Sequence, residues 1–254
     1  KTVPQVAQDF LPPNLDANLS SSGSMEKGLS LKANLDFDKY ESWAIKLNQA
    51  DAKDHKAQPM LLNIAWQGID RAVPYIGWLS SAEGHTDVTL KEGQQDIYVS
   101  TKVRPHEKTL LPTGQYNARF DVKGDLLDVE RFHYQAEKGS LTGQAKVKLP
   151  NEKQQLAWQA QLQAQNFNPQ TVVATAPVNL LNGQIKATGS AKPNQQIIQL
   201  DQIDLKGQLA QAGKTETVAL KGKSTAALIF HDQKAGGGFK SFAVNYDGSL
   251  NALN

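Results

Sequence analysis

The sequence has no cysteine among its 254 residues. Disulfide bonds, thiol catalysis and cysteine-ligated metal sites are therefore excluded, although this absence does not assign a cellular compartment. Long apolar runs are also missing, since no stretch approaches the ~18 residues that a membrane-spanning helix requires. Lysine and arginine (27) nearly balance aspartate and glutamate (25), with the two signs mixed along the chain. Because no basic stripe exists to follow a phosphate backbone, we expect no nucleic acid partner.

Motifs that carry catalysis or cofactor binding are missing as well. The chain has no Gly-x-Ser-x-Gly elbow, no phosphate-binding loop and no dinucleotide fingerprint. The five histidines are His55, His85, His106, His133 and His231. Their spacing is not that of metal ligands. We therefore expect that the protein is not an enzyme and that it uses no cofactor and no metal.

What the sequence does contain is an apolar period of two that runs along most of the chain. Between positions 114 and 126 the even residues are glycine, alanine or larger apolar residues, whereas the odd residues are polar or charged. Successive side chains of a strand point to opposite faces, so this pattern predicts a ribbon with one apolar and one polar face. Similar segments follow one another at short intervals, at 29–37, 43–47, 62–66, 88–90, 97–103, 132–136, 141–149, 156–164, 183–189, 197–200, 203–209, 218–230 and 239–246.

Two segments have some helical character. Residues 69–82 place apolar side chains near one face of a helix, which Pro74 would limit to one or two turns. Residues 169–180 could form a second short helix, although adjacent valines and threonines there favour irregular structure. Neither helix could cover a sheet of many strands.

Local signals predict two interruptions of the strands. The sequence Glu137-Lys138-Gly139 predicts a hairpin turn between the segments on either side of it. The apolar positions change from even to odd between Leu200 and Ile203, which predicts a bulge or a tight turn.

The domain organisation follows from the same pattern. We expect residues 1–28 to form a loop-rich opening segment, with a short strand near 15–19. Residues 29–254 would form one continuous repeating sheet, with a soft boundary near 104–113 if the sheet divides.

Short turns make consecutive strands pair antiparallel. A sheet with one apolar face and no helical cover must curl onto itself, pack as two layers or bind something apolar. The predicted fold class is all-β: a long, curved antiparallel sheet, U-shaped, with an apolar concave face and at most one or two short helices.

Small residues are frequent on the apolar side of the pattern. Glycine and alanine there would allow the sheet to coil and two layers to approach closely. They would equally leave an open channel, whose wall is made by the larger apolar residues. The pattern alone leaves both interpretations open.

A repeated motif connects several of these strands. Residues 139–149 contain Gly-x-Leu-x-Gly, a tryptophan-containing strand follows at 156–162, and Asn-Phe-Asn-Pro closes the unit at 166–169. The Gly-x-Leu/Ile theme returns at 183–189 and 204–209. This arrangement resembles the repeating units of the TamB family, within the wider AsmA-like proteins, over most of the chain from residue 29.

The resemblance implies a bridge-like lipid-transfer protein of the Gram-negative envelope. Its groove would bind and conduct phospholipid acyl chains through the periplasm, supporting outer-membrane lipid homeostasis and outer-membrane protein assembly. We expect this chain to be an interior fragment of a parent anchored in the inner membrane. A BamA-like outer-membrane barrel, TamA, would be the partner of regions outside this fragment.

The groove lining expected from this resemblance consists of the larger apolar residues of the alternating face. These are Leu31, Leu35, Tyr116, Phe120, Val122, Leu141, Val147, Leu156, Trp158, Leu162, Ile185, Leu205, Leu220 and Leu228.

Two alternative functions remain at this point. A structural or chaperone-like scaffold would template strands of outer-membrane or autotransporter proteins by pairing along its sheet edge. A secreted β-sandwich or solenoid adhesin would instead bury its apolar faces against each other.

Overall fold

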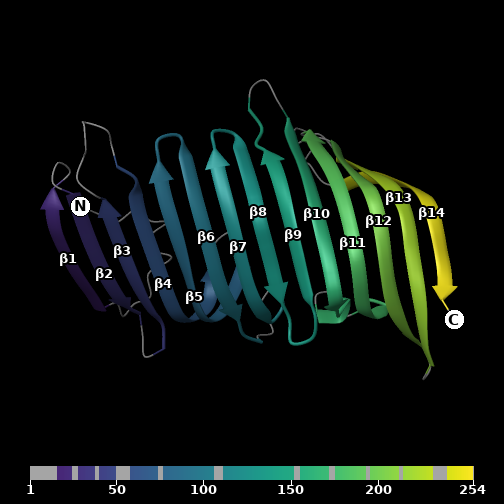
Figure 1. Ribbon diagram of the computed structural model, residues 1–254, viewed down its shortest axis with the longest axis horizontal. Coiled ribbons are helices and arrows are strands. Elements are labelled where there is room, and N and C mark those ends of the chain that lie inside the picture. The colour runs from purple at the N-terminus through teal and green to yellow at the C-terminus, as the bar shows by residue number, and fades with distance from the viewer. Residues whose placement is uncertain are drawn as a thin grey trace. The chain divides into compact units, whose positions relative to one another are not determined.

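The structure is a computed structural model that describes residues 16–24, 28–37, 40–49, 58–73, 77–105, 111–151, 155–171, 175–192, 195–211, 214–230 and 239–253. Fourteen strands form one antiparallel sheet, in which every strand is hydrogen-bonded to its neighbours in the chain (Figure 1). The prediction of an all-β antiparallel fold is confirmed. The strands are β1 (Asp16–Ser24), β2 (Gly28–Asp36), β3 (Ser42–Gln49), β4 (Met60–Val73), β5 (Gly77–Lys91), β6 (Gln94–Val103), β7 (Gly114–Lys123), β8 (Leu126–Gln135), β9 (Ser140–Lys148), β10 (Leu156–Phe167), β11 (Val178–Lys192), β12 (Gln195–Gln211), β13 (Lys214–Phe230) and β14 (Phe239–Leu253).

The chain divides into two compact units, unit 1 (residues 1–119) and unit 2 (residues 120–254). The boundary therefore lies within β7. The soft boundary expected near 104–113 includes residues 106–110, which lie outside the described residues. Near the start of the chain, β1 extends to Ser24 and pairs with β2 along its whole length.

The helix predicted for residues 69–82 is wrong. Residues 69–73 complete β4 and residues 77–82 begin β5, and the two runs pair with each other, with Ile69 opposite Ser81. Pairing with neighbouring strands outweighs a weak local helical period here, because each strand gains a ladder of backbone hydrogen bonds. Pro74, which would have interrupted a helix, lies outside the described residues.

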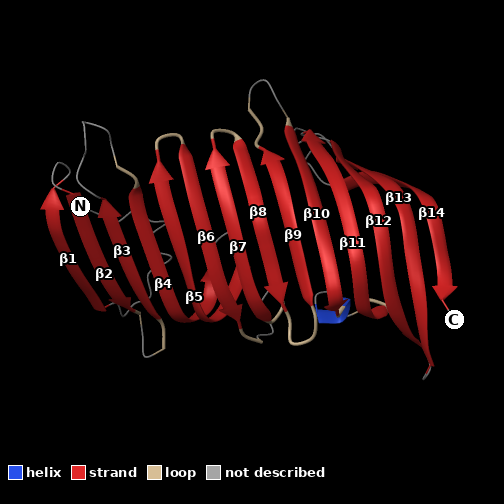
Figure 2. Ribbon diagram, viewed as in Figure 1, coloured by secondary structure: helices blue, strands red, loops and turns tan. Residues whose placement is uncertain are grey.

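Of the second expected helix, the described residues form a single 3-10 turn, η1 (Pro169–Thr171), seen in Figure 2. Asn168 holds this turn, because its carbonyl oxygen accepts from the Thr171 N–H (3.1 Å) and its side chain accepts from the Gln170 N–H (3.0 Å). The other described residues before β11, 175–177, are irregular, whereas the adjacent valines of this segment lie outside the described residues.

The predicted hairpin turn at 137–139 is confirmed. Gln135 lies opposite Ser140, and the Ala136 N–H donates to the carbonyl oxygen of Gly139 (3.1 Å). The alternating run at 114–126, however, is not one ribbon. A turn at Gly124, whose φ is +58°, ends β7 and reverses the chain, so the apolar side of this strand stops at Val122.

Bulges change which residues face the apolar side. The one predicted between Leu200 and Ile203 is confirmed by the registers of β12 with both of its neighbours. β8 has a register shift between Val129 and Phe132, and β10 has one before Phe167. An extra residue shifts the side-chain alternation by one position, so the same face stays apolar after the shift.

In each unit, several of the buried apolar side chains lie at or near the C-terminal ends of even-numbered strands. In unit 1 they are Phe37 after β2, Ile69 near the end of β4 and Val103 at the end of β6. In unit 2, Tyr134 near the end of β8 and Phe167 at the end of β10 form an edge-to-face ring pair with centroids 6.1 Å apart. Alternate strands of an antiparallel sheet run in the same direction, so within each unit these strand ends lie on the same side (Figure 1).

Candidate functional site

In unit 1 the strand registers bring apolar residues of successive strands opposite one another. Leu31 of β2 lies opposite Leu47 of β3, which lies opposite Leu62 of β4. The row continues through Val88 of β5 and Ile97 of β6. Because opposite residues of antiparallel strands share a face, this row is one line of a common apolar face.

The other predicted lining residues near this row fall on the same face. Leu35 lies opposite Trp43, which lies opposite Trp66. On β7, Asn117 accepts hydrogen bonds from side chains of β6 on the polar face. Its neighbour Tyr116 therefore points to the apolar face. Phe120 and Val122, which belong to unit 2, share its parity along β7.

In unit 2 the predicted residues Leu141, Leu205 and Leu220 lie in one row. Ala164 and Gly183 lie between the first two, each opposite its neighbour. Val147 lies opposite Trp158 in a parallel row, and Leu162 lies opposite Ile185. By alternation within their own strands, the same face carries Leu156 of β10 and Leu228 of β13.

Several apolar residues on this face are absent from the predicted lining. Most belong to strands with a regular period of two, so the same signal could have identified them. On β8 the bulge changes the parity of the inward residues from odd to even between Val129 and Phe132, so a single period of two over the whole strand does not identify them. The first group comprises Trp43, Ile45, Leu47, Leu62, Ile64, Trp66, Val88, Ile97, Ile198 and Leu200; the second comprises Leu127, Val129, Phe132 and Tyr134.

The apolar face is not filled by the side chains of the described residues. None of the predicted lining residues is buried. Leu31 remains 38% exposed and Leu162 44% exposed, and on β14 Leu250 is 68% exposed. A two-layer core would bury leucines of this kind. Within the described part of the chain, each unit therefore presents an apolar face that is open to another molecule.

Near one end of this face in unit 1, aromatic rings gather around an ion pair. Trp43 lies between Phe37 and Trp66, with ring centroids 6.3 and 5.8 Å away. The guanidinium of Arg71 lies 5.1 Å from the centroid of the Phe37 ring. Glu41, only 6% exposed, accepts from Trp43 Nε1 (2.7 Å) and pairs with Arg71 Nη2 (2.8 Å). Both contacts fall on Oε1, so the buried carboxylate has a hydrogen-bond donor and a cationic partner within the protein.

A tryptophan lies over a glycine of the next strand in both units. Trp66 lies opposite Gly84, and Trp158 lies opposite Gly189. A Cβ atom on either glycine would lie 2.3 Å from the indole ring. Only glycine lets these rings lie against the backbone, and one such tryptophan–glycine pair occurs on the apolar face of each unit.

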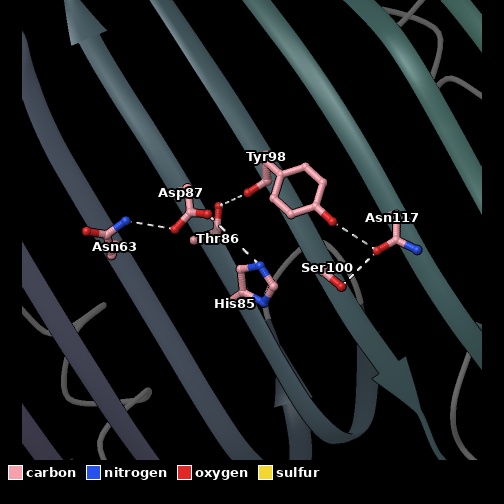
Figure 3. Close-up of polar contacts among 7 residues, drawn as sticks. All are labelled: Asn63, His85, Thr86, Asp87, Tyr98, Ser100 and Asn117. Atoms are coloured by element: carbon pink, nitrogen blue, oxygen red, sulfur yellow. Dashed lines mark hydrogen bonds and ion pairs between the residues drawn. The ribbon is translucent and has the colours of Figure 1, made fainter.

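The opposite face of unit 1 carries a polar network, shown in Figure 3. Asn63 Nδ2 donates to Asp87 Oδ1 (2.8 Å), and the Ser100 hydroxyl donates to Asn117 Oδ1 (2.8 Å). His85 Nε2 lies 4.0 Å from Asp87 Oδ2. Because the Ser100 hydroxyl donates to an amide rather than to His85, the serine, histidine and aspartate do not form a nucleophilic relay.

A family comparison identifies the chain. The model described as "TamB, N-terminal domain" matches residues 16–235. The chain belongs to the TamB family. No curated protein and no solved structure matches it.

The TamB match covers the whole of the predicted lining, since it includes every residue from Leu31 to Leu228. It also covers both tryptophan–glycine pairs. Among the described residues of this TamB-family chain, no helix has the length and hydrophobicity needed to span a membrane.

Proposed function

We propose that the apolar face of each unit binds lipid acyl chains, as part of a periplasmic segment of a bridge between the inner and outer membranes. The observation that carries the proposal is the row-by-row register of aliphatic side chains that the described residues leave unburied. Membership of the TamB family supports it independently. The cellular role would be phospholipid supply to the outer membrane and support of outer-membrane protein assembly.

The driving force is the transfer of hydrocarbon out of water. Each CH₂ group that leaves water gains about 0.8 kcal/mol. Aliphatic side chains with glycine and alanine between them offer similar contacts at every position. Binding to these aliphatic side chains is unspecific along the face. An acyl chain can therefore move along it without first escaping from a deep energy minimum.

The proposal assigns binding rather than catalysis, and it requires no cofactor. Anchoring in the inner membrane and contact with a BamA-like outer-membrane barrel, TamA, would belong to regions outside this chain. The lipid head group would stay in water while its acyl chains lie on the apolar face.

Co-purified lipid is the first test. Native mass spectrometry of the purified 254-residue chain should show bound phospholipid, and Leu205→Arg should reduce the bound amount several-fold. Leu205 is half-buried in the middle of its row, so a charge there would be desolvated by an acyl chain. The matched control is Lys206→Glu, one residue along on the polar face, which should leave the lipid signal unchanged. Lipid-free wild-type protein would contradict the proposal.

Pairing along a sheet edge is a second candidate function, supported by β14. Among the described strands, β14 is hydrogen-bonded to β13 alone, along nearly its full length, and its described side chains are exposed, including Val244 (55%). A client strand could add along the side of β14 that faces away from β13. Cysteine crosslinks from β14 to an unfolded outer-membrane protein, in a fixed register, would support this function.

A further inference from the structure

The four tryptophans differ in what their indole N–H groups contact. Trp43, Trp66 and Trp78 donate to side-chain oxygens of the protein, at 2.7, 3.1 and 2.9 Å. Trp158 Nε1 has no acceptor among the described residues. Tryptophan N–H groups that become buried normally find an acceptor, so Trp158 differs from the other three in a chemically relevant way.

The surroundings of Trp158 explain why its donor is unpaired. Across the sheet it lies between Val147 and Gly189, and along its own strand the residues on the same face are Leu156 and Ala160. None of these side chains carries a hydrogen-bond acceptor. The donor therefore lies within an apolar part of the lining.

Gly189 holds this indole in place. The ring atoms nearest to a Cβ built on Gly189 are Cε2, Cζ2 and Nε1, at 2.3, 2.4 and 2.6 Å. The same atoms of Trp66 lie at 2.3, 2.3 and 2.6 Å from a Cβ on Gly84. The two indole rings thus pack against their glycines alike, but Trp66 donates to the buried Ser81 hydroxyl, whereas Trp158 has no acceptor among the described residues.

Water can satisfy the Trp158 donor while the face is empty, because the residue is only half-buried. An acyl chain that covers the ring would displace this water and leave a buried donor without an acceptor, which weakens binding. A ligand that brings a carbonyl oxygen to this position avoids the loss. In a lipid, the carbonyl nearest to the hydrocarbon is that of the acyl ester.

We propose that Trp158 is a lipid-binding residue that donates a hydrogen bond from Nε1 to the ester carbonyl of an acyl lipid, with Gly189 as its positioning residue. This inference rests on the proposed binding of acyl chains and deepens it, because it gives one point on the face where the ligand has a preferred register. The ligand class is an ester-linked acyl lipid rather than hydrocarbon of any kind.

The experiment compares two soluble probes that differ at the carbonyl. Dioctanoyl phosphatidylcholine and its dioctyl ether analogue are titrated into the full 254-residue chain by isothermal calorimetry. The ester should bind roughly two- to tenfold more tightly than the ether, the range expected for one hydrogen bond. Trp158→Phe keeps an aromatic ring but removes the donor, so it should abolish this preference.

Trp66→Phe is the matched control. The Trp66 ring also packs against a glycine, but its indole N–H already donates to a side chain of the protein. This substitution should leave the ratio of ester to ether affinity as in the wild type. Equal affinity of the two probes for the wild-type chain would overturn the inference, and this comparison does not depend on any variant folding. A preference that survives in Trp158→Phe, or disappears equally in Trp66→Phe, would overturn it as well.

Two further outcomes are distinguishable. If neither probe binds the wild-type chain, the proposed acyl binding itself fails. If the probes bind equally and Trp158→Phe instead weakens binding of an unfolded polypeptide, the donor recognises a peptide carbonyl and the lipid assignment is wrong.

Discussion

At the scale of single residues, glycine determines where the large rings of the apolar face can lie. A period of two marks Trp66 and Trp158 as inward residues, but it does not say what each ring contacts. The glycines opposite them were visible in the sequence only as small residues, for which coiling and channel formation were both open. The registers show that Gly84 and Gly189 provide the space that the indoles occupy.

Gly189→Ala should destabilise unit 2 by about 1–3 kcal/mol, because the new methyl group overlaps the Trp158 ring and forces it to move. Urea denaturation followed by circular dichroism would measure the change.

A double-mutant cycle provides the control for this substitution. In a Trp158→Leu background the smaller side chain leaves room, so Gly189→Ala should cost clearly less than it does alone. Equal costs in both backgrounds would show that the ring does not set the requirement for glycine.

At the scale of strands, the regular segments could be predicted and the irregular ones could not. Alternation identified the ribbons around Leu31, Leu62 and Leu141, and the change of phase at Leu200 identified a bulge. The helix expected at 69–82 failed because its weak helical period is overridden by pairing of the two strand ends. The inward residues of β8 were missed although its apolar positions change from odd to even between Val129 and Phe132, the same kind of phase change that identified the bulge at Leu200.

Substitutions of Asn166 would test how the bulge near the end of β10 forms. Asn166 has a φ of +48°, within the left-handed region, beside the register shift that precedes Phe167. Asn166→Val should cost about 1–2 kcal/mol, because a β-branched side chain disfavours this conformation. Asn166→Gly should be tolerated far better, since glycine adopts positive φ freely.

Thermal unfolding of the two variants, side by side, would measure this difference. The Asn166 N–H bond to Asn182 Oδ1 (2.8 Å) uses the backbone and is available to both replacements, so it does not bias the comparison. Equal stability of the valine and glycine variants would contradict a left-handed conformation at this position.

At the scale of the whole molecule, the sequence pattern correctly indicated an all-β antiparallel sheet, and the registers show one apolar face in each unit. The pattern could not say whether that face is covered, because glycine and alanine suit both a packed layer and an open channel. The exposed fractions of Leu31 and Leu162 favour the open face within the described residues. The lipid-binding proposal requires that the apolar face is open rather than covered.

Site-specific photo-crosslinking tests that claim most directly. A photoreactive residue would replace Leu31 or Leu162 on the apolar face, and, as matched controls, Lys32 or Gln163 one position along on the polar face. All four positions are exposed, so accessibility alone does not separate them. We predict lipid adducts, identified by mass spectrometry after irradiation in cells, at Leu31 and Leu162 only. Adducts of equal yield at the polar positions, or no lipid adduct at any position, would contradict the account.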